Sequence, residues 1–174
     1  MLFVSGLLTI VAAISVPALT AGLERSRARA AARYLVGQMA MVRTQAVTRS
    51  TTMALRFQRG AGGLTIAVYA DGNSNGVRIR DIDAGADRMV ERPVRLEDLF
   101  PGVIVGVPVS SDAEAVELGG SELLSFTPDG TSSSGSVHIL GRDGSQFVAR
   151  ILGVTGRTRL LRFESETGQW LETF

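Results

Sequence analysis

Residues 2–23 have the sequence LFVSGLLTIVAAISVPALTAGL, which is 22 consecutive uncharged positions, and charge begins abruptly at Glu24. A helix rises about 1.5 Å per residue, so a helix of this length extends roughly 33 Å, enough to cross the apolar core of a bilayer. We therefore expect residues 1–23 to form a transmembrane half-helix. Pro17 lies inside it and predicts a helix kink, because proline removes one backbone hydrogen bond.

The helical pattern continues beyond the uncharged run, and we expect residues 24–50 to form the amphipathic half of the same helix. Small and apolar residues recur there at steps of four and three, which places them on one face. This face consists of Ala28, Ala32, Leu35, Met39, Val42 and Ala46. Arg25, Arg29 and Arg33 share a different face. These arginines either form the solvated or headgroup end of the span or meet acidic groups of a partner.

The composition excludes several classes of function. The 174 residues include no cysteine and one histidine, His138, and all 18 basic residues are arginine. Disulfide scaffolds, thiolate metal sites, cysteine nucleophiles and lysine Schiff bases are therefore excluded. His138 has apolar neighbours in sequence, and the chain carries no nucleophile elbow, metalloprotease motif or paired-carboxylate motif. We expect neither an enzyme nor a bound cofactor.

The charge is unevenly divided along the chain. Residues 1–59 carry eight arginines and one acidic residue, a net charge of +7. Residues 60–174 carry ten arginines and sixteen acidic residues, a net charge of −6. This division predicts that the positive N-terminal part meets anionic lipid, nucleic acid or an acidic partner.

From residue 51 onward the pattern changes to the alternation of β-strands, with turn residues between short apolar runs. A region of this length with several strands can bury a core without disulfides. The expected strands are residues 53–59, 64–70, 103–109, 122–127, 136–140, 146–152 and 157–163.

The sequence DGNSNG over residues 71–76 has two interpretations. Oxygen-bearing side chains at positions 1, 3 and 5 and glycine at position 6 match the first half of a calcium loop, but position 12, which needs a carboxylate, is Ile82. We expect no second helix after this loop. The alternative, which we favour, is a tight structural turn, since asparagine and glycine tolerate positive φ. The calcium candidates are Asp71, Asn73 and Asn75, and the turn residues are Asp71, Gly72, Asn73, Asn75 and Gly76.

Several segments together resemble one family. AAISVP at residues 12–17 resembles the segment that closes the membrane half of the pilin helix. DGNSNGVRIRDI at residues 71–82, followed by Gly85 and Asp87, resembles the DGNxNGxRxxDI signature of the GspH/FimT pseudopilins. FTPDG and TGRTR further along are similar to later landmarks of that family. The resemblance covers nearly the whole chain, and the segment that ends at Asp87 is its most specific part.

The resemblance implies an α+β, pilin-like fold, in which the long N-terminal helix packs on an antiparallel β-sheet domain over residues 51–174. It implies a minor pseudopilin of a type II secretion system, a structural subunit of the pseudopilus that takes part in protein export. The expected partners are other major and minor pseudopilins, contacted through the helix, the inner-membrane assembly platform and an exported substrate. The expected location is the bacterial inner membrane, crossed once, with the β domain in the periplasm.

The resemblance also bears on the N-terminus. Aligned on AAISVP, Met1 falls at about the sixth position of a mature pilin-like chain. We expect upstream in-frame codons to encode a leader with its cleavage glycine, then the phenylalanine that is N-methylated, and a glutamate four residues later. Stop codons at those positions would contradict this expectation.

Residues 156–159, Gly-Arg-Thr-Arg, resemble the GRxR motif that in FimT-type minor pilins is associated with DNA binding during natural transformation. Alternation along a strand places Arg157 and Arg159 on one face, and arginine is a strong phosphate ligand. The other interpretation is an exposed hairpin face whose arginines meet water or pair with Glu164 and Glu166. The acidic balance of the C-terminal part argues against a large DNA surface.

Two alternatives to the secretion subunit therefore stay open. The first is a DNA-binding minor pilin of a type IV pilus or competence machine, in which Arg157 and Arg159 grip phosphate. The second is an exported β-rich binding domain whose apolar N-terminus is a signal peptide cleaved near Ala21. The mass of the mature protein tests this second alternative: cleavage near Ala21 would support it, and an intact helix would eliminate it.

Overall fold

The computed structural model describes residues 2–60, 63–109, 111 and 113–173, and for residues 2–21 it describes the backbone alone. The helices are α1 (Leu2–Thr48), α2 (Ile79–Asp83) and α3 (Leu96–Leu99). The strands are β1 (Met53–Gly60), β2 (Gly63–Ala70), β3 (Arg88–Arg95), β4 (Val103–Val105), β5 (Val116–Glu117), β6 (Leu123–Phe126), β7 (Gly135–Gly141), β8 (Gln146–Leu152), β9 (Arg157–Glu164) and β10 (Gln169–Glu172).

The long helix α1 confirms the predicted periodicity. It ends at Thr48, two residues before the expected end. All six residues of the predicted stripe, from Ala28 to Ala46, are at most 1% exposed. The side chains of Arg25, Arg29 and Arg33 lie on the exposed side of the helix. The amphipathic half of α1 is therefore held against the sheets from Ala28 to Ala46.

The predicted transmembrane half falls almost entirely outside the described side chains. The side chains of residues 1–21 are not described, and the kink expected at Pro17 therefore lies outside the described residues. Among the described residues, no helix combines the length and the apolar character needed to cross a bilayer.

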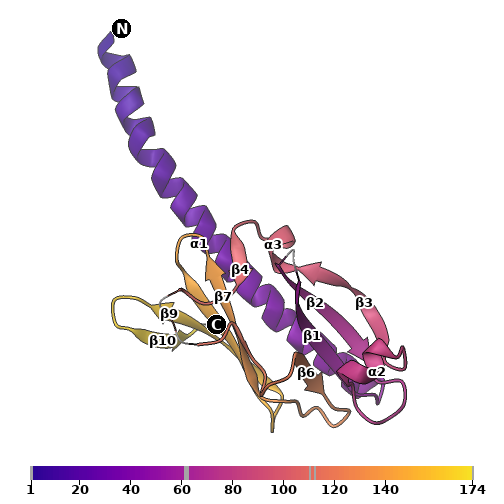
Figure 1. Cartoon of the computed structure of the whole chain (residues 1–174). Helices are drawn as coiled ribbons and strands as arrows, with labels where there is room; N and C mark the ends of the chain where they lie inside the picture. Colours follow the sequence, from indigo (N-terminus) through magenta and orange to yellow (C-terminus); the bar gives the residue numbers. More distant parts are fainter. Residues whose placement is uncertain (1, 61–62, 110, 112, 174) are drawn as a thin grey trace.

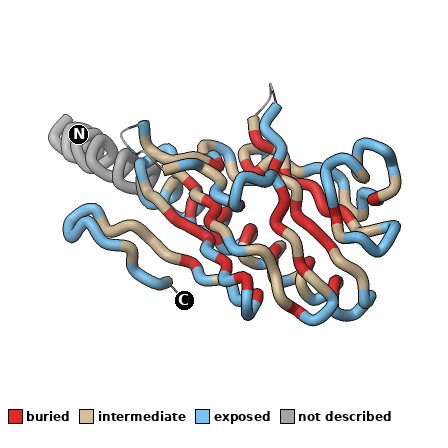
Figure 2. The backbone as a smooth tube through the Cα atoms, turned by 60° about the horizontal axis from the view of Figure 1, so that its bottom comes forward, coloured by how far each residue is buried: buried red, intermediate tan, exposed pale blue. Residues whose placement is uncertain are grey.

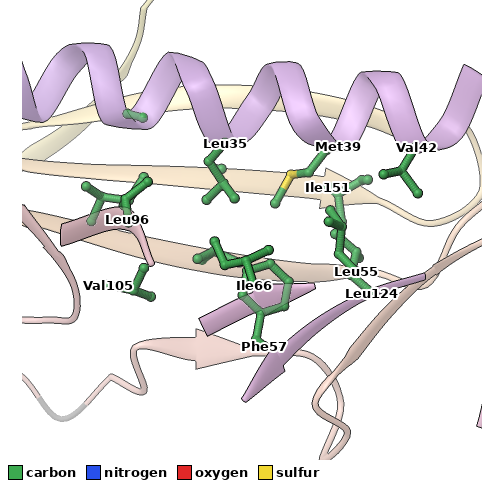
Figure 3. Packing of buried hydrophobic residues seen from close by; sticks show 14 of the residues in the cluster. Leu35, Met39, Val42, Leu55, Phe57, Ile66, Leu96, Val105, Leu124 and Ile151 are labelled. Atoms are coloured by element: carbon green, nitrogen blue, oxygen red, sulfur yellow. The ribbon is translucent and has the colours of Figure 1, made fainter. Parts of the chain in front are cut away.

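The strands form two antiparallel sheets beside α1 (Figure 1). The first sheet has the order β3-β2-β1-β6, and the second has the order β10-β9-β8-β7-β4, with β5 also paired to β7. One apolar core joins the helix to both sheets. In Figure 3, Leu35, Met39 and Val42 of α1 point toward Leu55 of the first sheet and Ile151 of the second. Figure 2 shows the buried positions running along the strands and the exposed positions at the turns.

All seven predicted strands are present, but several details of the prediction are wrong. The strand expected over 103–109 ends at Val105, because Gly106 donates one further backbone bond to His138 and Pro108 has no N–H to donate. Strands β3, β5 and β10 were not predicted. A short helix, α2, follows the 71–76 turn, although no helix was expected there.

Candidate functional site

The 71–87 connection between β2 and β3 is organised around one buried carboxylate. Asp87 is 3% exposed, and its Oδ1 accepts the backbone N–H of Gly72 at 3.1 Å while its Oδ2 accepts that of Arg78 at 2.9 Å. These charge-assisted bonds tie the beginning and the middle of the connection to its last residue. Gly72 is required for space, since a Cβ there would lie 2.0 Å from the carbonyl oxygen of Ala86.

The predicted turn over residues 71–76 is closed by side-chain acceptors. Asp71 Oδ1 accepts the N–H of Asn73 at 3.0 Å, and its Oδ2 accepts the N–H of Gly76 at 2.7 Å. Asn73 Oδ1 accepts the N–H of Asn75 at 3.3 Å. The three calcium candidates therefore share one turn, in which Asp71 and Asn73 already bind backbone N–H groups. Within the described residues, no cluster of three or more acidic or imidazole side chains is placed to hold a metal ion. The calcium interpretation stays a prediction.

The same connection covers the outer face of the first sheet. Val77, with Ile82 of α2, packs on a small apolar cluster separate from the core beside α1. The sheet residues of this cluster are Ala54, Ala67, Tyr69 and Leu123. Arg56, whose side chain is 11% exposed, lies 3.7 Å from Asp83 of α2 and 3.5 Å from Glu122. In this chain the connection is a structural cover for the sheet.

The second candidate, residues 156–159, begins at a crowded glycine. Gly156 has a φ of +60°, and a Cβ there would lie 2.4 Å from the carbonyl oxygen of Gly130 and 2.7 Å from Nε of Arg43. That Nε donates a hydrogen bond to the Gly130 carbonyl at 2.8 Å. The helix α1, the loop between β6 and β7 and the turn between β8 and β9 therefore meet at Gly156. Sequence reasoning missed Arg43, because nothing local links it to residues so distant along the chain.

The two predicted nucleic-acid arginines are brought together on the outer face of the second sheet. Arg157 and Arg159 are exposed on the same side of β9, and Arg150 of β8 lies directly opposite Arg159. We call Arg150, Arg157 and Arg159 the arginine ridge. Like charges placed opposite one another on a sheet repel, so an anion bound to this ridge would relieve the repulsion. Arg159 Nε lies 3.9 Å from a carboxylate oxygen of Glu172, an exposed contact that contributes little. The expected pairing with Glu164 is instead made by Arg162.

An aromatic group flanks these arginines. The ring of His138 meets that of Trp170 edge-on, with centroids 5.8 Å apart, and Trp170 also contacts Phe163 at 5.2 Å. Burial is the main cause that lowers the pKa of His138, and Glu117 opposes the shift. The lowered pKa favours the neutral imidazole, and the contact with Trp170 is that of a packed side chain.

One long helix whose buried stripe packs on antiparallel sheets is the architecture that was expected of a pilin-like protein. A family model described as Type II transport protein GspH matches residues 31–156. The chain belongs to the GspH family. The matched residues include the whole 71–87 connection and end at Gly156, so Arg157 and Arg159 lie beyond them.

One solved structure is similar at low identity. It is the structure of the minor pseudopilin EpsH from the Type 2 Secretion System of Vibrio cholerae, with 8% sequence identity and a TM-score of 0.46. The similarity covers 84% of this chain and 96% of that chain. Among curated proteins there is no match.

Proposed function

We propose that this chain is a minor pseudopilin, a structural subunit of a type II secretion pseudopilus that takes part in protein export. Membership of the GspH family over residues 31–156 carries the proposal. The packing of α1 supports it, because the stripe from Ala28 to Ala46 joins the helix firmly to the domain that it would carry. The proposed role is mechanical and not catalytic: the helix anchors and polymerises, and the sheets present contacts to other proteins.

The proposal places residues 2–23 in the inner membrane as a single span, with the β domain in the periplasm. The 22 uncharged positions of this segment support a span. In a fibre the same segment leaves lipid for a bundle of helices without losing the burial of its apolar surface. The proposed partners are other pseudopilins, the assembly platform and exported cargo.

The proposal predicts that removing the chain stops export. In a deletion strain the secreted proteins of the system should accumulate in the periplasm, and the full chain should restore their export. The measurement is the ratio of cargo in the medium to cargo in the periplasm. Complementation by Arg157→Ala/Arg159→Ala should be complete, since these arginines have no part in the mechanical role. Normal export in the deletion strain, together with a loss of DNA uptake, would replace this proposal by the second candidate.

The second candidate is a DNA-binding minor pilin. The ridge formed by Arg150, Arg157 and Arg159 supports it, because three exposed guanidinium groups share one face of two paired strands. A contact to phosphate replaces condensed counterions, so binding through this ridge must weaken as salt rises.

This candidate predicts salt-dependent binding of DNA by the full chain in nonionic detergent. Replacing Arg157 and Arg159 by alanine should reduce the log–log slope of affinity against salt by about two, one for each phosphate contact. Arg49→Ala/Arg88→Ala changes the net charge equally at two exposed positions of other elements and should leave the slope unchanged. Equal slopes for both double variants would remove the DNA-binding candidate.

A further inference from the structure

A groove lies between α1 and the hairpin formed by β9 and β10. The helix packs against β7, β8 and β9, and the hairpin extends outward beyond it (Figure 1). Two cavities, of about 440 Å³ and about 220 Å³, lie beside the hairpin and share Arg25 and Arg162. We call the larger one the collar groove. It is lined by Arg25, Arg29, Arg162, Leu171, Glu172 and Thr173.

The collar groove carries a surplus of positive charge. Its lining holds three arginines and one acidic residue, Glu172, whose carboxylate lies near Arg159. The acidic residues Asp143, Glu164 and Glu166 line the smaller cavity. Because Arg162 pairs with Glu164, the positive charge that the collar groove offers to a partner is that of Arg25 and Arg29.

The two helix arginines of the groove can accept an anionic partner. The side chain of Arg25 is 73% exposed, and its Nε is 3.9 Å from the nearest Asp143 oxygen, a distance at which an exposed pair contributes little. Arg29 lies one helical turn further along and is exposed. A carboxylate between them would gain two charge-assisted hydrogen bonds.

The groove runs along a free strand edge. β10 is the last strand of the second sheet, and within the described residues no strand pairs with its outer side. The N–H of Thr173 donates a hydrogen bond to the carbonyl of Leu160 in β9. Along a strand the backbone N–H and C=O groups of successive residues point to opposite sides, so those of Trp170 and Glu172 point toward the free edge. Leu171 lines the groove and is 43% exposed.

This edge differs from that of the first sheet. β3 carries Pro93, which cannot donate a hydrogen bond, and its pairing with β2 contains two register shifts. Both features discourage the addition of another strand. β10 contains no proline, and its register with β9 is regular. The edge of β10 is thus open to pairing.

We propose that the collar groove binds an extended acidic segment of a neighbouring subunit of the fibre, added antiparallel to β10. Acidic side chains at every second position of that segment face Arg25 and Arg29, and the alternate apolar side chains lie on the side of Trp170. Charge complementarity supports this occupant, because the exposed side chains of Arg25 and Arg29 line the groove in which its acidic side chains would lie. The proposal rests on the function proposed above.

The test is binding of a short fluorescent peptide of alternating glutamate and valine to the full chain in nonionic detergent. Saturable binding that weakens with salt is expected. Arg25→Glu/Arg29→Glu should weaken it at least about tenfold, because two attractive charges become repulsive. Arg49→Glu/Arg88→Glu, with the same change in net charge, should stay within about twofold, since these residues lie away from the groove. The absence of binding, or equal losses in both variants, would overturn the proposal.

A second pair of peptides tests the strand pairing itself. In antiparallel pairing with acidic side chains in the groove, the valine amides face β10 and the glutamate amides face solvent. N-methylation of the valine amides should therefore abolish binding, and N-methylation of the glutamate amides should leave it intact. Binding that survives both modifications would show attraction by charge alone and would overturn the proposed pairing.

The source of the segment is tested in cells that assemble the fibre. A photo-cross-linking amino acid at position 171 should join the chain to an acidic extended segment of another fibre subunit, identified by peptide mass spectrometry. Cross-linking only to exported cargo, or to a second copy of this chain, would overturn the proposed source. Full export by Arg25→Glu/Arg29→Glu, with export lost in the deletion strain, would reject the groove and leave the secretion role standing.

Discussion

Replacing Asp87 by alanine should lower the free energy of unfolding by about 3 kcal/mol, because two charge-assisted hydrogen bonds are lost and two partly buried backbone N–H groups lose their acceptor. The groups concerned are the N–H of Gly72 at 3.1 Å and that of Arg78 at 2.9 Å. For a chain of this size, such a loss lowers Tm by roughly 6–12 °C. Thermal unfolding of the full chain in nonionic detergent, followed by circular dichroism, measures the effect.

The matched control is Asp83→Ala in the same connection. Asp83 has a side chain that is 65% exposed and lies 3.7 Å from Arg56. An exposed ion pair is worth less than about 1 kcal/mol, so Tm should change by no more than a few degrees. Equal effects of the two alanine variants would show that Asp87 does not hold the connection together.

Replacing Gly156 by alanine should lower the free energy of unfolding by about 3 kcal/mol, from a left-handed backbone and a steric overlap. The new Cβ would lie 2.4 Å from the backbone oxygen of Gly130, which cannot move without displacing its loop. It would also press on Arg43 at 2.7 Å and disturb the hydrogen bond from α1. The same thermal unfolding experiment measures the loss.

Gly168→Ala separates the two causes. Gly168 has a φ of +66°, close to that of Gly156, but a Cβ there would meet nothing within 4 Å. Its replacement should cost only the backbone strain, about 1–2 kcal/mol. If the two variants melt at the same temperature, the crowding at Gly156 has no energetic consequence. The expected difference also means that a Gly156 variant cannot test DNA binding, since it alters the local packing and the stability of the domain as well.

The helix was predictable because its signal is local and periodic. The stripe from Ala28 to Ala46 follows the spacing of one helix face, and each of its residues is buried. The inner strands were predictable for the same reason, since runs such as β2 and β8 are apolar and bounded by glycine turns. β3 was missed because its sequence, RMVERPVR, belongs to an exposed edge and carries charges and a proline where an inner strand has apolar residues.

The candidate sites were predictable only as residue types. The turn at residues 71–76 was recognised from asparagine and glycine, but the role of Asp87 depends on contacts nine and fifteen residues away. The place of Arg150 opposite Arg159 depends on the register of two strands, which composition does not encode. The collar groove joins Arg25 and Arg29 of α1 to Arg162 of β9 through packing of the whole domain, beyond the reach of any local pattern.

The meeting of three elements at Arg43 has a mechanical consequence. In the proposed role of a fibre subunit, traction on the N-terminal helix acts along the axis of α1. Because the buried stripe of α1 lies lengthwise against both sheets, that force acts parallel to the interface, and the contacts resist it together in shear instead of opening one at a time. The hydrogen bond from Arg43 to the carbonyl of Gly130 stabilises this interface near the C-terminal end of α1, beside the turn that contains Gly156. Traction on the helix is thus shared by both sheets.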